Sequence, residues 1–250
     1  MRHEEIQRIY KNHYFLGFRD MGNVKKLVGK VDVVVCFVND KQSTWTAQAK
    51  QQYKQTQLEA MRYIQRTAHS RGVNLQMRNA YIEATVPMTC GRDNYVEWSK
   101  AIANQCGSPD LYSFQRSFKI KNKCDEAPIL FVWNNKFRSS AYRTDWETRL
   151  FGEMARISAP ATVHTIVHEL LHQFGAQDLY YPIELENLVK KLNYASVMAT
   201  YDSQYIDSLT SYLIGWSNEI DRSAVKILEC TKHLTEASII AAIRREHQRR

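Results

Sequence analysis

The chain has 250 residues, of which 44% are apolar, and its 34 Lys and Arg residues outnumber its 26 Asp and Glu residues, so the formal net charge is +8. A chain of this length and composition can bury a sizeable core in one large domain or two small ones. Its five cysteines, without CxxC spacing, do not suit a disulfide scaffold. Its longest apolar run, residues 33–38, is far shorter than the roughly 20 residues that span a bilayer.

No targeting or membrane segment is recognisable in the sequence. If the chain is complete, we expect a cytoplasmic protein, with a secreted mature form as the alternative. The excess positive charge favours acidic partners, and much of it lies in residues 119–123 and 244–250. Neither stretch interleaves aromatic with basic residues, as a single-strand binder would. We therefore interpret both stretches as solvated faces and do not expect a nucleic-acid partner.

The first half of the chain predicts strands around one long helix. A β-branched run at residues 31–38 indicates a buried strand. Apolar residues at mostly helical spacing predict a helix over residues 46–70. A second strand region follows at 73–86, where apolar and polar residues alternate. Residues 88–127 hold several Gly, Pro and Cys residues, and we interpret them as an insertion that contains a short helix near 95–104.

Three more strands are expected before the next helix. Two lie at residues 128–135 and 149–158, and a short edge strand is expected between them at 139–143. The order of strand, long helix, several strands and a further helix predicts an α+β layered fold. Residues 218–250 are expected to form one or two helices that pack against the domain, with docking to a partner as the alternative.

The next helix starts near Ala161 and has two chemically different faces. Its apolar residues recur at i, i+3, i+4, i+7, i+8 and i+11, the pattern of an amphipathic helix. On the other face His168 and His172 are four residues apart, so both imidazoles can bind one zinc ion. Glu169 lies beside them, where it can accept a proton from activated water. The apolar positions are Val163, Ile166, Val167, Leu170, Leu171 and Phe174.

This HExxH pattern is expected by chance only roughly 0.015 times in a chain with 8 His residues, so a merely structural origin is disfavoured. Gly175 can take the left-handed backbone conformation that ends a helix and turns the chain back toward a metal. Asp178 then becomes the candidate third ligand. Three protein ligands leave the fourth zinc position open, as catalytic sites require.

The segment HELLHQFGAQD, residues 168–178, resembles the metzincin zinc-binding motif HExxHxxGxxD, in the variant that ends in Asp as in the snapalysin-like peptidases. Metzincins place a methionine-containing turn beneath the zinc. ASVMATYD, residues 195–202, offers Met198, preceded by Ser196 as in the family's SxM pattern. The resemblance implies that Met198 supports the site without binding zinc. Some metzincins have a tyrosine two residues after this methionine; here it is one position later, so Tyr201 is the candidate transition-state contact.

The likeness extends over roughly residues 30–220 and implies a metzincin-like fold. That fold has a twisted mixed β-sheet with a long backing helix and an active-site zinc helix, followed by a smaller, mainly helical C-terminal subdomain. We expect a catalytic domain over residues 1–217, with an upper subdomain at about 30–175 and a lower subdomain at about 176–217. Residues 218–250 would form a helical extension.

The resemblance and the chemistry together imply a zinc endopeptidase with one catalytic ion held by His168, His172 and Asp178. Glu169 would act as the general base toward a zinc-activated water and would then pass the proton to the leaving amine. A peptide or protein substrate would lie extended along an edge strand such as residues 139–143.

The third ligand could also come from a different part of the chain. In gluzincins it is a glutamate on a later helix, which would here be Glu184 or Glu186. That assignment leaves Gly175 and Asp178 unexplained. His164, one turn before His168, is expected to be solvated or hydrogen-bonded.

Cys106 is a candidate latency switch. It lies in CGSPD, which resembles the core of the cysteine switch in matrix-metalloproteinase propeptides; a simple turn is the alternative. Asp202 and Asp207 could help order the turn around Met198 or cap the next helix, and capping is expected. Instead of an enzyme, the chain could be a basic module that binds nucleic acid or protein and carries a non-catalytic metal site, and the presence of Glu169 argues against this class.

Overall fold

The computed structural model describes residues 1–142, 153–200 and 203–235. The chain folds into two compact units. One unit is continuous and comprises residues 22–173. The second unit combines residues 1–21 with the chain from residue 174 onward.

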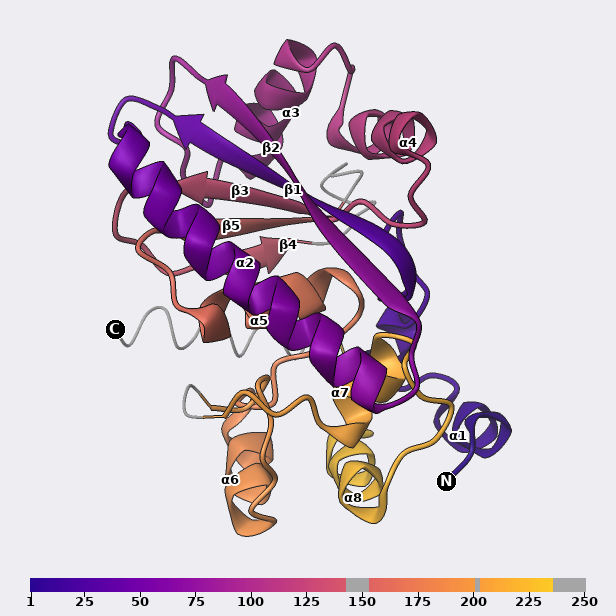
Figure 1. Ribbon diagram of the computed structural model, residues 1–250. Coiled ribbons are helices and arrows are strands. Elements are labelled where there is room, and N and C mark those ends of the chain that lie inside the picture. Colours follow the sequence, from indigo (N-terminus) through magenta and orange to yellow (C-terminus); the bar gives the residue numbers. More distant parts are fainter. Residues whose placement is uncertain (143–152, 201–202, 236–250) are drawn as a thin grey trace. The chain divides into compact units, whose positions relative to one another are not determined.

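The continuous unit is built on one five-stranded sheet in the order β2-β1-β3-β5-β4. The first four of these strands run parallel, and β4 is antiparallel to β5 at the edge. Figure 1 shows the long β1 and β2 side by side, as their eleven-residue register requires. The strands are β1 (Gly29–Asn39), β2 (Leu75–Thr85), β3 (Ile129–Trp133), β4 (Ser140–Tyr142) and β5 (Met154–Ser158).

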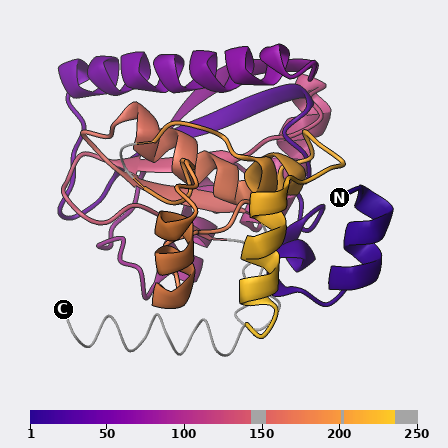
Figure 2. The same ribbon diagram turned by 90° about the horizontal axis from the view of Figure 1, so that it is seen from below.

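Two helices of this unit, α2 (Ala47–Ser70) and α5 (Val163–Gln173), pack against each other (Figures 1 and 2). The helix α2 begins where the Thr46 hydroxyl accepts the Ala49 N–H at 3.1 Å, which satisfies one of the free donors of a helix start. Alternate side chains of β1 face α2. One of them, Phe37, makes an edge contact with Tyr53 of α2, with ring centroids 5.9 Å apart.

The remaining side chains of β1 build a second core with α3 (Tyr95–Gln105) and α4 (Leu111–Asn122). Trp98 of α3 is fully buried, and its ring centroid lies 5.2 Å from Phe131 and 5.0 Å from Trp133 on β3. The sheet is thus covered on both faces, which explains why β1 is an almost unbroken apolar run. Further members of this core are Val34, Cys36, Val38, Ala84, Ile102, Leu111, Ile129 and Met154.

The second unit is mainly helical in its described residues. Its helices are short, and α6 (Ile183–Lys191) contacts α8 (Arg222–Thr231). The N-terminal segment packs into this unit: the Arg19 guanidinium lies 3.9 Å from the ring centre of Tyr212 and donates to the Tyr212 carbonyl at 2.8 Å. The elements are α1 (His3–Tyr10), the 3₁₀-helix η1 (Tyr14–Phe18), α6 (Ile183–Lys191), α7 (Ser208–Leu213) and α8 (Arg222–Thr231).

The chain is therefore a mixed α/β protein with a mostly parallel sheet and eight α-helices in the residues described. The strands predicted at 31–38, 73–86 and 128–135 and the helix predicted at 46–70 are confirmed, each with slightly different ends. The short strand predicted at 139–143 is β4, and it lies at the sheet edge as expected.

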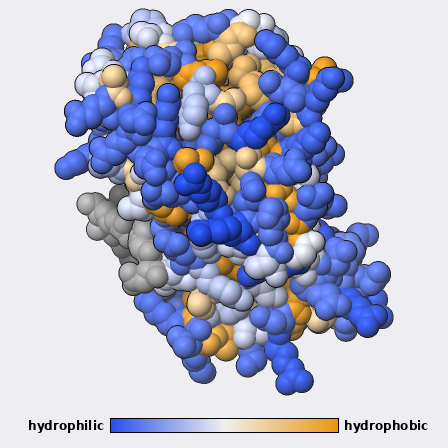
Figure 3. Space-filling model, in the orientation of Figure 1, coloured by the Kyte–Doolittle hydropathy of each residue, from blue (hydrophilic) through white to orange (hydrophobic). Residues whose placement is uncertain are grey.

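Two predicted segments differ from the structure. Residues 88–127 hold α4 as well as the expected helix, and both pack on the sheet. The strand predicted at 149–158 is β5 from Met154; residues 149–152 lie outside the described residues. No helix in the described part of the chain combines the length and apolar character needed to cross a membrane. Figure 3 shows hydrophilic residues over most of the visible face, with apolar residues interspersed.

Candidate metal centre

The helix α5 carries the HExxH motif and is fixed at both ends. At its start, the Thr162 hydroxyl accepts the Thr165 N–H at 3.1 Å, an N-cap. At its end, the Gln173 side chain accepts the Ile129 N–H of β3 at 2.9 Å, which ties the helix to the sheet. Its apolar face, Ile166, Val167, Leu170 and Leu171, is completely buried.

The opposite side of α5 brings His168 and His172 together. Their Nε2 atoms are 3.1 Å apart, and the rings meet edge to face with centroids separated by 4.6 Å. Two imidazole nitrogens bound to a tetrahedral zinc at about 2.0–2.1 Å would be about 3.3 Å apart. The observed separation is close to this value, so both nitrogens already point to a common position. His168 is 8% exposed, so this position is partly shielded from solvent.

Asp178 completes a group of three candidate ligands within the continuous segment from His168 onward. One ligand atom from each of His168, His172 and Asp178 lies within 4.8 Å of the others. In the described part of the chain this is the group of histidine, cysteine and acidic side chains that could hold a metal ion. Two imidazoles and one carboxylate match the donors that zinc takes in catalytic sites, so the residues present fit the ion.

The chain between α5 and Asp178 turns at Gly175, which has φ +110°. A Cβ at this position would lie 3.0 Å from the Phe18 carbonyl oxygen and 3.1 Å from the Leu213 carbonyl oxygen. A larger residue here would be strained by the positive φ and crowded by the two carbonyl oxygens, so it would lower the stability of the fold. Gly175 therefore adopts the positive φ that was expected at the end of this helix.

Glu169 follows His168 on α5 and is 6% exposed. A carboxylate so placed is adjacent in the chain to one candidate ligand and three residues before the second. This is the position from which a general base acts in the HExxH pattern. Glu169 is therefore buried on α5, next to His168 in sequence, and is not a surface charge.

Met198 lies in the middle of a turn over residues 197–199 and is completely buried. The Met198 N–H donates to the Ser196 hydroxyl at 2.9 Å, and the Val197 N–H donates to the Tyr205 carbonyl at 2.7 Å. The Leu179 N–H, directly after Asp178, donates to the Met198 carbonyl at 2.8 Å. The turn and the candidate third ligand are thus joined through the main chain.

Asp207 holds this turn in place and caps α7. Its buried carboxylate accepts the Ser196 hydroxyl at 2.5 Å, the Tyr194 hydroxyl at 2.7 Å and the Thr210 N–H at 2.9 Å. Burial, and then the negative charge of Asp207, raise the pKa of Tyr194, so this hydroxyl stays protonated as a donor. The predicted cap is confirmed, and Asp207 also holds the turn at Met198 through Ser196, which was the alternative role expected from the sequence. In the sequence, this role is indicated by an aspartate, Asp207, that follows the SxM pattern at Ser196 and Met198.

The structure does not bring the remaining candidate residues into the metal group. Glu186 forms an ion pair with Lys190 on α6, and Glu184 is exposed on the same helix. His164 stacks on His168 with ring centroids 5.8 Å apart. Cys106 is the residue directly after α3, and burial raises the pKa of its thiol, which disfavours a metal-binding thiolate.

Tyr201, the candidate transition-state contact, and Asp202 lie outside the described residues. Their roles remain predictions, as do the domain boundaries expected at residues 176 and 218. The boundary between the two compact units falls at residue 174.

The chain matches no family model and no curated protein sequence at a significant level. Among solved structures it is similar to metalloproteinase-II from Bacteroides fragilis, with a TM-score of 0.34 and 13% sequence identity. The similarity covers 90% of this chain and spans 60% of the length of that protein.

Proposed function

We propose that this chain is a zinc-dependent endopeptidase of metzincin-like type. The observation that carries the proposal is the pair of Nε2 atoms of His168 and His172, 3.1 Å apart on a helix with the buried carboxylate of Glu169 between them in sequence. Asp178, as the candidate third ligand, also favours this proposal. The residue after it, Leu179, is hydrogen-bonded to the buried turn at Met198.

A zinc ion would supply Lewis acidity, which lowers the pKa of water and polarises a peptide carbonyl. His168, His172 and Asp178 would hold the ion. Glu169 would accept the proton from the attacking water and then donate it to the nitrogen of the leaving amine, which balances the proton over the reaction. The apolar face of α5, packed against the sheet, holds His168, Glu169 and His172 on one rigid helix.

The substrate would bind as an extended strand beside β4. This strand is at the edge of the sheet and pairs only with β5 among the described strands. A peptide can add its main-chain hydrogen bonds to such an edge. An extended peptide or protein segment is therefore the proposed substrate class.

The test combines zinc analysis of the purified chain with cleavage of a peptide library. We expect about one zinc ion per chain and measurable cleavage. Glu169→Gln should retain zinc and lose at least a hundredfold in cleavage rate, since general acid–base catalysis contributes about 10²–10⁴-fold. His168→Ala should lose both zinc and cleavage.

Matched controls separate this proposal from a gluzincin-type site and from a non-catalytic metal site. Glu184→Gln and Glu186→Gln should leave zinc content and cleavage unchanged; loss of zinc in either variant would favour the gluzincin-type site. Zinc binding without cleavage of any peptide by the native chain would favour the non-catalytic site. Equal cleavage by the native chain and Glu169→Gln would overturn the mechanism.

A further inference from the structure

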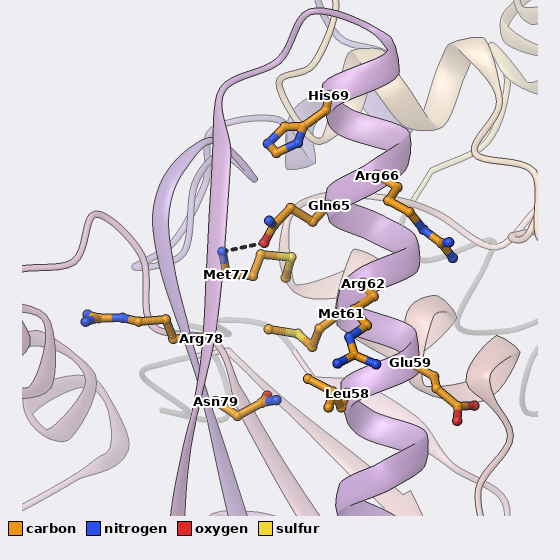
Figure 4. Close-up of a pocket in the computed structure, with 10 residues that line it drawn as sticks. All are labelled: Leu58, Glu59, Met61, Arg62, Gln65, Arg66, His69, Met77, Arg78 and Asn79. Carbon is orange, nitrogen blue, oxygen red and sulfur yellow. Dashed lines mark hydrogen bonds between the residues drawn. The ribbon is translucent and has the colours of Figure 1, made fainter.

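The helix α2 and the strand β2 enclose a groove of about 440 Å³ on the sheet edge opposite to β4. From here on we call it the α2–β2 groove. Figure 4 shows Leu58, Met61 and Gln65 projecting from α2 toward β2, where they meet Met77 and Asn79. The remaining residues that line it are Glu59, Arg62, Arg66, His69 and Arg78.

The main chain of β2 at this groove is engaged by side chains of α2. The Gln65 side chain accepts the Met77 N–H at 3.0 Å, and His69 Nε2 lies 2.9 Å from the Leu75 carbonyl. Because these atoms point away from β1, residues 75, 77, 79 and 81 direct their main-chain groups to the open edge. An added strand would offer a main-chain carbonyl to Met77 in place of the Gln65 amide.

The groove combines an apolar floor with a basic border. Met61 is buried and Met77 half-buried, whereas Arg62 and Arg66 are exposed. In the described part of the chain, neither of these two guanidinium groups forms an ion pair. Arg78 differs, because it projects from β2 away from α2 (Figure 4) and binds Asp32 of β1 through two contacts of 2.8 Å. Glu59 is the only acidic residue among those lining the groove.

The basic border continues along α2, beside β2. Lys50 pairs with Glu83 at 2.6 Å, and the Lys54 ammonium lies 4.7 Å from the ring centre of Tyr81. These contacts keep α2 alongside the whole strand. Two copies of this chain pairing through β2 would bring the same basic residues together, and like charges oppose such pairing. The occupant that suits this edge is therefore acidic.

We infer that the α2–β2 groove binds an extended acidic segment of a partner protein, which adds to the sheet as a strand beside β2. Main-chain hydrogen bonds to the outward-pointing groups of β2 hold the segment, and its carboxylates pair with Arg62 and Arg66. A nucleic acid could satisfy the charge but not the strand hydrogen bonds. This inference does not depend on the proposed peptidase activity, because the groove lies at the edge of the sheet formed by β2.

The test uses fluorescein-labelled peptides of eight residues and fluorescence anisotropy with the full chain. The probe alternates Glu with Val. One control alternates Lys with Val, and a second is the Glu–Val peptide with every peptide nitrogen methylated, which keeps the charge but removes all main-chain donors. We expect binding of the Glu–Val peptide, at least tenfold weaker binding of the methylated peptide, and no binding of the Lys–Val peptide.

Charge reversal locates the site. Arg62→Glu with Arg66→Glu should weaken binding of the Glu–Val peptide at least tenfold. Arg116→Glu with Lys121→Glu, which changes the net charge equally at exposed positions on α4, should change it less than twofold. If the first pair impairs folding, seen as a lowered Tm, Arg62→Gln with Arg66→Gln replaces it, with the same expected loss of binding.

Three results would overturn the inference. Equal weakening by the two charge-reversed pairs would mean that only net charge attracts the peptide. Equal binding of the Glu–Val peptide and its methylated form would exclude strand addition. Tighter binding of a single-stranded oligonucleotide of the same charge, lost in the Arg62→Glu, Arg66→Glu variant, would identify a nucleic-acid site.

Discussion

The Leu179 N–H donates to the Met198 carbonyl at 2.8 Å, and this bond joins the residue after Asp178 to the turn that contains Met198. The position of the candidate third ligand therefore depends on a turn twenty residues later in the chain. This turn is itself held by Ser196, which accepts the Met198 N–H and donates to Asp207. Each link in this series can be tested separately.

Met198 should act through its volume and not as a ligand. Its side chain is completely buried, so Met198→Ala should leave a cavity and lower the free energy of unfolding by about 2–5 kcal/mol. Met198→Leu conserves most of the volume and should cost less than about 1.5 kcal/mol. Urea unfolding and zinc content check both variants. Zinc loss in Met198→Leu without a loss of stability would indicate direct ligation.

Ser196 should matter more than its size suggests. Ser196→Ala removes the acceptor of the Met198 N–H and one donor to the buried Asp207 carboxylate, so we expect a loss of about 1–3 kcal/mol in the free energy of unfolding. Ser217 is a matched control, since its hydroxyl accepts the Glu219 N–H at 2.9 Å at an exposed site. Ser217→Ala should cost less than about 0.5 kcal/mol. Equal costs for the two serines would contradict the role assigned to the buried network.

Gly175→Ala should destabilise the turn that precedes Asp178. Alanine must adopt φ +110° there and place its Cβ about 3 Å from two backbone carbonyl oxygens, so the expected cost is roughly 1–3 kcal/mol. Gly17 has an ordinary φ and nothing within 4 Å of an added Cβ. Thermal unfolding of Gly17→Ala should therefore show little change, and a Gly175→Ala variant as stable as the native chain would mean that the turn can relax.

His13 should make stability depend on pH. Its Nδ1 accepts the Phe15 N–H at 3.1 Å, and its Nε2 lies 3.0 Å from the Leu228 carbonyl, so the neutral ring fits this site. Burial lowers its pKa, an effect partly opposed by the bond to Leu228 and the charge of Glu229. Below about pH 6.5 the unfolded chain then binds a proton that the folded chain does not, so the free energy of unfolding falls as the pH drops.

The measurement for His13 is urea unfolding of the native chain and His13→Gln at pH 7.5 and pH 5.5. Glutamine does not titrate in this range, so the variant should lose less stability between the two values than the native chain. Equal losses in both proteins would show that His13 is not the group responsible.

Local patterns in the sequence were sufficient for the elements with strong periodicity. The run at 31–38 became β1, and the spacing of apolar residues over 46–70 became α2, because burial on a sheet face and on a helix stripe repeats with fixed periods. The helices α1, α4 and α6 were missed. Each buries only two residues, so its apolar pattern is too brief to stand out.

The same limit applies to the candidate site. The spacing of His168, Glu169 and His172 places them on one helix face, which a helix period alone predicts. The contacts of Asp207 with Tyr194 and Ser196 depend on how the chain folds back after α6, over separations of 13 and 11 residues. No repeating pattern encodes such a contact, so it emerges only from tertiary structure.

The division of the chain into a continuous and a discontinuous unit has a consequence for biosynthesis. All five strands of the sheet lie within residues 22–173, so their partners are present before the C-terminal helices are translated, whereas α1 and Arg19 contact Tyr212, which is translated late. The nascent chain thus carries an unsatisfied amphipathic N-terminal segment through most of its synthesis.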